Sequence, residues 1–114
     1  MVTGMRESQT AVLERGIRLE DEFATEPFEV AWAGEARWFV QFLEPCDDAT
    51  VTLTTQVSAD GLAWVDHESP AVKAEASGVI TVGVRDFGHW LRLVVQRSGG
   101  STAPLTRVYL ALKE

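Results

Sequence analysis

The chain has 114 residues, of which 46% are hydrophobic and 24% are charged, and its formal net charge at pH 7 is −7. A chain of this length supports one hydrophobic core, and its apolar content is that of a folded domain rather than a disordered segment. The acidic charge disfavours nucleic acid and anionic lipid, which need clustered Lys and Arg, and no run of about 18 apolar residues could span a membrane. We therefore expect a folded domain that binds neither nucleic acid nor membrane.

The first 25 residues follow neither a helical nor a strand pattern throughout. Residues 1–9 carry charge and no apolar stretch, so they do not resemble a signal peptide, and we expect the protein in the cytoplasm or on a particle assembled there. A short helix over residues 8–15 is one interpretation, whereas the alternation from Ile17 to Glu20 favours a strand. We predict an extended N-terminal arm over residues 1–25, with one short strand or helix, followed by a β domain over residues 26–114.

Short segments of alternating polarity follow the arm, and turn-forming residues separate them. In residues 35–43, Trp38, Val40 and Phe42 share one face. Other strands are predicted over 28–32, 50–57, 78–84, 89–96 and 105–112, with loops at 47–48, 60–61, 77–78, 86–88 and 98–104. About eight or nine short strands predict an all-β fold, a single antiparallel β-sandwich, with jelly-roll and immunoglobulin-like topologies both left open.

One segment combines the end of a strand, a turn pair and an aromatic residue. Ser58, Asp60, Gly61 and Trp64 stand in the pattern S-x-D-G-x-x-W. Asp-Gly is favoured in a two-residue hairpin turn, because both central residues of that turn have positive φ, and the Ser and Asp side chains can bond to turn amides. We expect these residues to form a structural turn, with Trp64 covering the hairpin.

The S-x-D-G-x-x-W pattern resembles the one in discoidin-like domains of the coagulation-factor type, where an Arg-containing strand follows. Residues 88–93 are similar to that strand, and the resemblance covers about residues 50–112, without the front half of that family. The pattern is also similar to hairpins in small β-sandwich modules of phage and bacterial surface proteins, and to the Asp-box of sialidase-type propellers, which has one more residue before the aromatic. The discoidin-like resemblance implies glycan or lipid binding through loops at one end of the sandwich.

Metal-binding and catalytic patterns do not stand out. The Asp66-His67-Glu68 run is the best metal candidate, but consecutive strand residues point to opposite faces, so we expect a solvated loop there. The Asp47-Asp48 pair lacks the regular ligand spacing of a calcium loop. Neither histidine has a nucleophile motif beside it, and no Gly-rich phosphate loop occurs. We predict no catalytic residues, no metal site and no cofactor, and a reduced thiol at Cys46.

Four tryptophans are a high count for this length, and they fit either core packing or an aromatic platform for a partner. Trp38 and Trp64 are predicted to lie in the core. Trp32, beside an Ala-Gly pair, and Trp90, on the same strand face as an arginine, are candidates for exposure, and an exposed Trp marks an interface. The candidate partner or ligand residues are therefore Trp32, Trp90, Asp86, His89 and Gln96.

Two functions fit these observations. The first is a non-enzymatic structural module that partners itself or other protein subunits through its arm and strand edges. Such a module would be a self-associating subunit or a decoration-type accessory component of a larger assembly, such as a phage-like virion. The alternative is a carbohydrate-binding module that uses an exposed Trp to bind glycan. An enzyme would need a pocket with convergent titratable groups, and we predict that the chain is not one.

Overall fold

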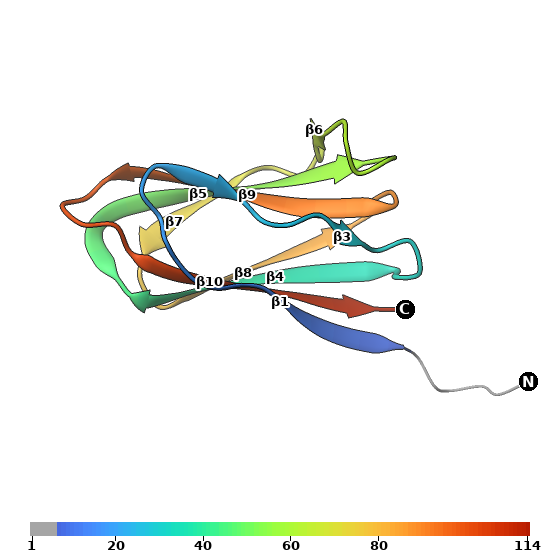
Figure 1. Ribbon diagram of the computed structural model, residues 1–114, viewed down its shortest axis with the longest axis horizontal. Helices are drawn as coiled ribbons and strands as arrows, with labels where there is room; N and C mark the ends of the chain where they lie inside the picture. Colours follow the sequence, from blue (N-terminus) through green and yellow to red (C-terminus); the bar gives the residue numbers. More distant parts are fainter. Residues whose placement is uncertain (1–6) are drawn as a thin grey trace, which may run out of the picture.

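Ten strands form the regular structure of residues 7–114, the part of the chain that the computed structural model describes. They are β1 (Ser8–Arg18), β2 (Glu22–Ala24), β3 (Phe28–Glu29), β4 (Glu35–Glu44), β5 (Cys46–Ser58), β6 (Val65–Asp66), β7 (Val72–Ala76), β8 (Val79–Arg85), β9 (Trp90–Gly99) and β10 (Leu105–Lys113). They make two antiparallel sheets that face each other (Figure 1), so the predicted β-sandwich is confirmed. Within residues 7–114 there is no helix of the length and apolarity needed to cross a membrane.

The order of the strands decides between the two topologies that the sequence left open. One sheet has the order β1-β10-β4-β8, and the other has the order β2-β9-β5-β6, with β3 also on β9 and β7 also on β5. The first two strands therefore lie in different sheets, whereas an immunoglobulin-like sandwich places them side by side in one sheet. β2 and β3 both pair with β9, and β6 and β7 both pair with β5, so each of these two pairs counts as one interrupted strand. Counted in this way, the two sheets have the strand order of a jelly roll.

The core consists of alternate side chains from the long strands of both sheets. Trp38, Val40 and Phe42 point inward from β4, as predicted, and Trp38 is fully buried. The Trp38 Nε1 donates a hydrogen bond to the Thr55 Oγ1, 3.0 Å away across the core, so its polar atom is satisfied. Other fully buried side chains come from β9 and β10: Leu91, Leu93, Val95, Val108 and Leu110.

The N-terminal segment differs from the prediction. Residues 8–18 form β1, which pairs with β10 from Ser8–Lys113 to Arg18–Leu105, so they are an edge of the four-stranded sheet and neither a helix nor a separate arm. Register shifts at Val12/Glu14 and Glu14/Ile17 interrupt the alternation, which explains why the sequence shows no clean period there. Residues 1–6, which belong to the predicted arm and to the segment compared with a signal peptide, lie outside the described residues.

The predicted loop at Asp47-Asp48 is wrong, because both residues belong to β5. The pairing of β5 with β7 shifts between Cys46 and Thr50, so the two aspartates lie in an irregular part of the strand. Hydrogen bonds from the Cys46 thiol, 2.9 Å from Asp48 Oδ1, and from the Ser101 amide lower the pKa of Asp48. A residue pair typical of turns can thus stand in a strand where a bulge lets one carboxylate bond to neighbouring groups.

The loop between β9 and β10 packs tightly against its surroundings. Gly100 has a φ of 90°, and a Cβ there would lie 2.7 Å from the Ala49 Cβ and 2.9 Å from the Cys46 Sγ. The Arg97 Nε donates to the carbonyl of Glu20 at 2.7 Å. The Arg97 Nη1 donates to the carbonyl of Gly99, the last residue of β9, at 3.2 Å and to that of Thr102 in the loop at 3.0 Å. This loop is therefore joined to β5 and to the β1–β2 connection.

Candidate functional site

The loop from β5 to β6 is built by its own side chains. The Ser58 Oγ accepts hydrogen bonds from the amides of Gly61 at 2.8 Å and Asp60 at 3.3 Å. The Asp60 Oδ1 accepts from the amides of Leu62 at 2.9 Å and Ala63 at 3.0 Å. The bonds from the Ala63 and Leu62 amides, followed by the bond from the Ser58 hydroxyl, lower the pKa of Asp60. The Asp60 side chain thus stabilises the loop when its carboxyl group is ionised.

The loop is longer than the predicted two-residue hairpin turn. Val57 pairs with Val65, so residues 58–64 all lie outside the β5–β6 ladder. Gly61 has a φ of 81°, but Asp60 is not among the described residues with positive φ, and a two-residue turn of the Asp-Gly type needs positive φ at both. The prediction of a tight hairpin is therefore wrong, although Ser58, Asp60 and Gly61 do make the turn hydrogen bonds.

Trp90 covers this loop, in the place predicted for Trp64. A Cβ on Gly61 would lie 3.3 Å from the Trp90 Cε2, so the indole packs on bare glycine backbone. The other neighbour of Trp90 is His89, with the two ring centroids 5.6 Å apart. The His89 Nε2 lies 2.9 Å from the Glu29 Oε2. Trp90 is half-buried, and its ring lies beside the His89 imidazole, which in turn contacts the Glu29 carboxylate.

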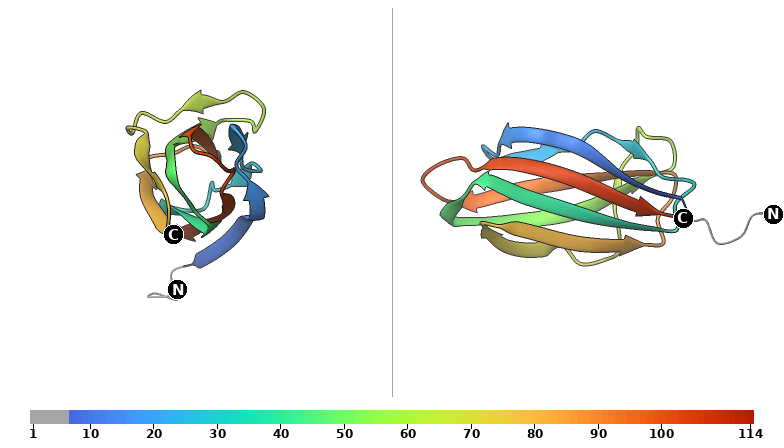
Figure 2. Two further views of the ribbon diagram at one scale, coloured as in Figure 1. Left: turned by 90° about the vertical axis from the view of Figure 1, so that its left-hand side faces the viewer. Right: turned by 90° about the horizontal axis from the view of Figure 1, so that it is seen from below.

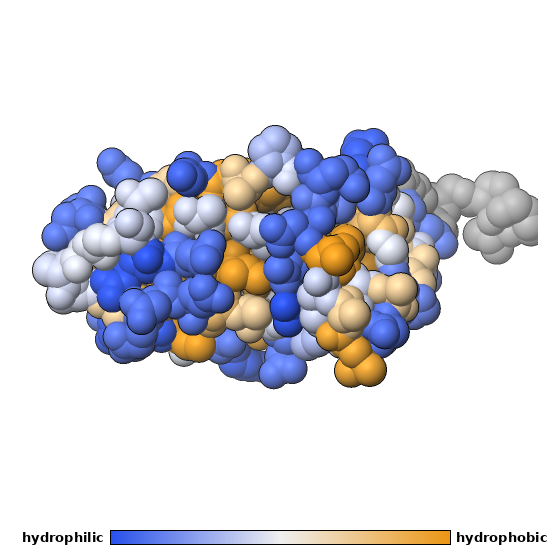
Figure 3. Space-filling model, turned by 90° about the horizontal axis from the view of Figure 1, so that it is seen from above, coloured by the Kyte–Doolittle hydropathy of each residue, from blue (hydrophilic) through white to orange (hydrophobic). Residues whose placement is uncertain are grey.

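Trp64 is half-buried on the outer face of the six-stranded sheet and does not belong to the core. The Arg92 Cζ lies 4.5 Å from the centroid of its ring, which is a cation–π contact. The Arg92 Nε donates to the Gln56 Oε1 at 2.7 Å, and the Gln56 Nε2 donates to the Asp66 Oδ1 at 2.8 Å. Figure 3 views the molecule from the side of β5 and β9, where apolar side chains form separate areas among hydrophilic ones.

The five predicted ligand residues are not brought to one place. Trp90, His89 and Asp86 share the start of β9 and the segment before it, and Asp86 has a φ of 56°. Gln96 lies about 20 Å further along β9 and donates to the Glu22 Oε1 at 3.1 Å. Trp32 lies in the segment between β3 and β4 and lines a separate hollow of about 490 Å³ with Glu7, Ser8, Gln9 and Glu114.

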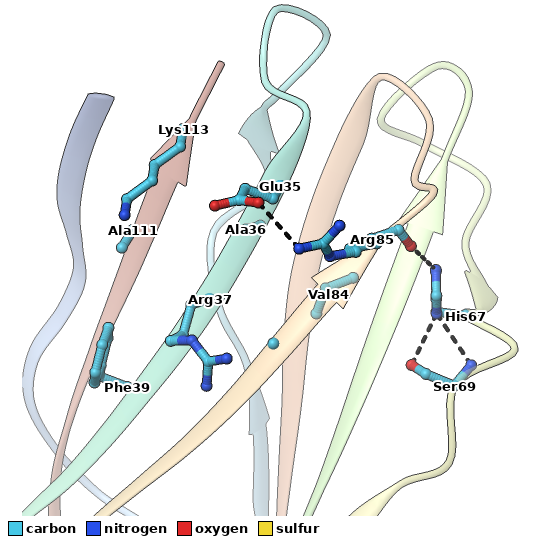
Figure 4. A pocket seen from close by; sticks show the side chains of 11 residues that line it. Glu35, Ala36, Arg37, Phe39, His67, Ser69, Val84, Arg85, Ala111 and Lys113 are labelled. Carbon is cyan, nitrogen blue, oxygen red and sulfur yellow. Dashed lines mark hydrogen bonds and ion pairs between the residues drawn. The ribbon is translucent and has the colours of Figure 1, made fainter. Parts of the chain in front are cut away.

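A larger hollow of about 580 Å³ lies beside β8, and no residue pattern in the sequence indicates it. Figure 4 shows residues from β4, β8 and β10 around it, together with His67 and Ser69 from the segment between β6 and β7. Arg37, Arg85 and Lys113 line it, against one carboxylate, Glu35, whose Oε2 is 3.3 Å from the Arg85 Nη2. The hollow is therefore locally basic on an acidic protein.

His67 connects the segment after β6 to the end of β8. Its Nε2 lies 2.8 Å from the Arg85 carbonyl oxygen and 3.1 Å from that of Asp86, and because carbonyls only accept, this nitrogen carries the proton. Its Nδ1 accepts from the Ser69 amide at 3.0 Å. The imidazole is buried, so the predicted solvated loop is wrong at His67. In the part of the chain described, no group of three or more His, Cys, Asp or Glu residues could hold a metal ion.

The two edges of the four-stranded sheet, β1 and β8, are visible from below in Figure 2. β8 pairs with β4 without a register shift, from Val79–Gln41 to Arg85–Glu35. Its inward side chains Ile80 and Val82 are only half-buried, and the outward Val79 is 58% exposed. β8 is therefore a regular edge strand, and two of its inward side chains are only partly covered.

Comparisons with known proteins identify solved structures with a similar fold but no protein family. No known protein family matches the sequence, and no curated protein matches it. The chain is similar to the SPBc2 prophage-derived protein YomS, with a TM-score of 0.67 and 6% identity over 100% of this chain and 99% of YomS. It is also similar to the PBSX exported protein XepA, with a TM-score of 0.66 and 12% identity over 91% of this chain.

The similar structures include an enzyme as well. The likeness to tripeptidyl peptidase 2 has a TM-score of 0.64 and 9% identity, and it covers 92% of this chain. The chain spans 36% of XepA and 10% of tripeptidyl peptidase 2, so in both proteins the likeness concerns one part of a longer chain. At these identities the comparisons show a shared β-sandwich, and the discoidin-like pattern at residues 58–64 stays a resemblance.

Proposed function

We propose that this chain is a non-enzymatic structural module, a self-associating subunit or an accessory component of a larger assembly such as a phage-like particle. The observation that carries this proposal is the open edge of β8, a regular seven-residue strand whose core side chains are incompletely covered. A sheet edge of this kind is a template for pairing with another chain. The fold likeness to YomS, which is prophage-derived and matched over nearly its whole length, supports the phage-like setting.

The chemistry of the larger hollow supports binding over catalysis. The guanidinium groups of Arg37 and Arg85 line it, and a guanidinium matches the geometry of a carboxylate with two parallel hydrogen bonds. The histidine that lines the hollow is committed to backbone carbonyls at the end of β8. Such a hollow suits an acidic side chain of a neighbouring subunit, and the partners that we propose are further copies of this chain or other protein subunits.

Fractionation of the source organism tests this role. An antibody against the full chain should detect it in the particle fraction of a density gradient, and immunogold labelling should place it on the particles by electron microscopy. A matched antibody against an unrelated small acidic protein controls for carry-over. Finding the chain only at the top of the gradient, apart from every particle, would contradict the proposal.

A carbohydrate-binding role is the second candidate, and one observation favours it. Trp64 and Trp90 are both half-exposed at the same end of the six-stranded sheet, beside the polar side chains of Gln56 and Arg92. Aromatic faces with neighbouring polar groups are able to hold a sugar ring. A glycan array with the full chain tests it, followed by tryptophan fluorescence with each hit. A Trp90→Ala variant should lose the signal, and an array without hits would contradict the role.

A further inference from the structure

The β8 edge lacks the protection that the other strand edges have. Natural sheets protect their edges with charges, bulges or very short strands. β1 has two register shifts and carries Glu14, Arg15 and Arg18, and β7 carries Lys73 and Glu75 over five residues. β2, β3 and β6 have only two or three residues each. β8 has seven residues, no register shift, and no charge before Arg85 at its end.

The backbone of β8 offers hydrogen-bonding groups on its open side. In an antiparallel strand, successive residues direct their N–H and C=O groups alternately to the two sides. The Gly78 carbonyl accepts from the Phe42 amide of β4 at 2.9 Å, whereas the Arg85 carbonyl accepts from His67 on the other side. The odd-numbered residues Val79, Thr81 and Gly83 therefore direct their groups away from β4. His67 occupies only the end of this row.

We propose that two copies of this chain pair through β8, antiparallel and about a two-fold axis, into one continuous eight-stranded sheet. The proposal rests on the assembly role proposed above. The register places Thr81 opposite Thr81 of the second copy, with Val79 opposite Gly83. A register shifted so that Val79 falls opposite Arg85 would need the Arg85 carbonyl, which His67 already holds.

The side chains of β8 suit a second copy of the same strand. Val79, 58% exposed, falls opposite Gly83, over which the Arg37 guanidinium of β4 lies, with its Nη2 2.8 Å from where a Cβ of Gly83 would be. On the inner face, Ile80 falls opposite Val82, so the contact covers the half-buried core residues of both copies. No charged residue occurs from Val79 to Val84, although the Arg37 guanidinium of β4 reaches over the strand and its Nη1 donates to the Thr81 Oγ1 at 3.1 Å. One contact covers both unprotected edges.

A lysine substitution on β8 tests the proposal, and a lysine substitution on β1, the other edge of the same sheet, is the matched control. Sedimentation velocity of the full chain at about 100 µM should show a dimer. Val79→Lys should weaken dimerisation on the order of tenfold or more, because each dimer contains the changed pair twice. Val12→Lys, at a residue 46% exposed on β1, should leave dimerisation unchanged. Thermal melts should show that both variants stay folded.

A cysteine pair tests the register. Residues opposite each other in a hydrogen-bonded pair have Cα atoms about 5.5 Å apart, within the range of a disulfide. Thr81→Cys should therefore form a covalent dimer on oxidation, whereas Val79→Cys, which faces Gly83, should not. Cys46 is buried and stays out of the reaction. Cross-linking of Val79→Cys instead of Thr81→Cys would overturn the register.

The outcomes separate this inference from the proposed function. A wild-type chain that stays monomeric at about 100 µM, or equal association of the two lysine variants, would overturn pairing through β8. Either result leaves the particle experiment unaffected, because an accessory subunit can attach through another surface. A chain that dimerises through β8 but is absent from particles would contradict the proposed function alone.

Discussion

Two loops of this sandwich are ordered in different ways. The β9–β10 loop depends on its neighbours, because Gly100 packs on Ala49 and Cys46, and Arg97 joins the loop to the carbonyl of Glu20. The β5–β6 loop depends on itself, because the Ser58 and Asp60 side chains bond to amides within residues 58–64. A change in the first loop should therefore disturb the fold, whereas the second can vary without loss of the core.

The largest effect should come from Gly100→Ala. The new Cβ would lie 2.7 Å from the Ala49 Cβ, and a φ of 90° is unfavourable for alanine, so we expect a loss of about 3 kcal/mol in the free energy of unfolding. Gly78→Ala is the matched control, since Gly78 also has a positive φ of 69° but no atom within 4 Å of the new Cβ. It should lose about 1 kcal/mol in urea unfolding. Equal losses would contradict the packing argument.

Arg97→Ala should have the next largest effect. The variant removes hydrogen bonds from a charged donor to the carbonyls of Glu20, Gly99 and Thr102, and we expect a loss of about 2 kcal/mol. Arg97→Lys keeps the charge but loses the planar fork, and it should recover less than half of this loss. Hydrogen exchange should rise in residues 19–21 and 99–104 together. A rise in only one of them would show that the loops are not joined.

Asp60 should make the stability contributed by the β5–β6 loop depend on pH. Its folded pKa lies below the ordinary value of 3.8, so its stabilisation is present above that pH and is lost as the pH falls through the folded pKa. Asp60→Asn keeps an acceptor oxygen but cannot titrate, so its stability should fall less steeply between pH 4 and pH 2. Asp48→Asn should behave in the same way, since its pKa is also lowered. Acid titration followed by circular dichroism measures both, and parallel curves for wild type and Asp60→Asn would contradict this role.

The smallest effect should come from Trp64→Leu, which removes the ring under the Arg92 guanidinium at the end of the loop. We expect a loss of about 0.5–1 kcal/mol, because the contact is half-exposed. Trp38→Leu is the contrast, since that indole is fully buried and its loss should cost several times as much. Urea unfolding of both variants checks this order, and a large loss at Trp64 would place it in the core after all.

Most of the fold could be predicted from residues that alternate strictly. Trp38, Val40 and Phe42 on β4 point inward, and over residues 36–41 that strand pairs with both β10 and β8 in a regular register. β1 could not be assigned, since its two register shifts move apolar residues off one face. β7 alternates as Val-Lys-Ala-Glu-Ala, a local strand signal that the predicted strands omit. β2 has only three residues, and its pairing to β9 depends on tertiary contacts that no local pattern shows.

The candidate site was less predictable, because it depends on contacts between distant segments. The burial of His67 comes from carbonyls about 20 residues later, and only the Ser69 that follows it was a local signal. β8 is an edge because it has a partner strand on one side only, and the sequence of a single strand cannot show how many partners it has. The lack of charge from Val79 to Val84 was visible, but it gains meaning only when β8 stands at the margin of a sheet.

The two ends of the described chain meet. The Glu114 amide donates to the Glu7 carbonyl at 2.9 Å, and the Glu7 amide donates to the Glu114 Oε1 at 3.1 Å, so both ends leave the sandwich at one point (Figure 1). A host chain could enter and leave the sandwich through neighbouring positions of a single surface loop. The geometry therefore permits this unit to be carried as an insert within other proteins, or to be rejoined with new ends, without unthreading a strand.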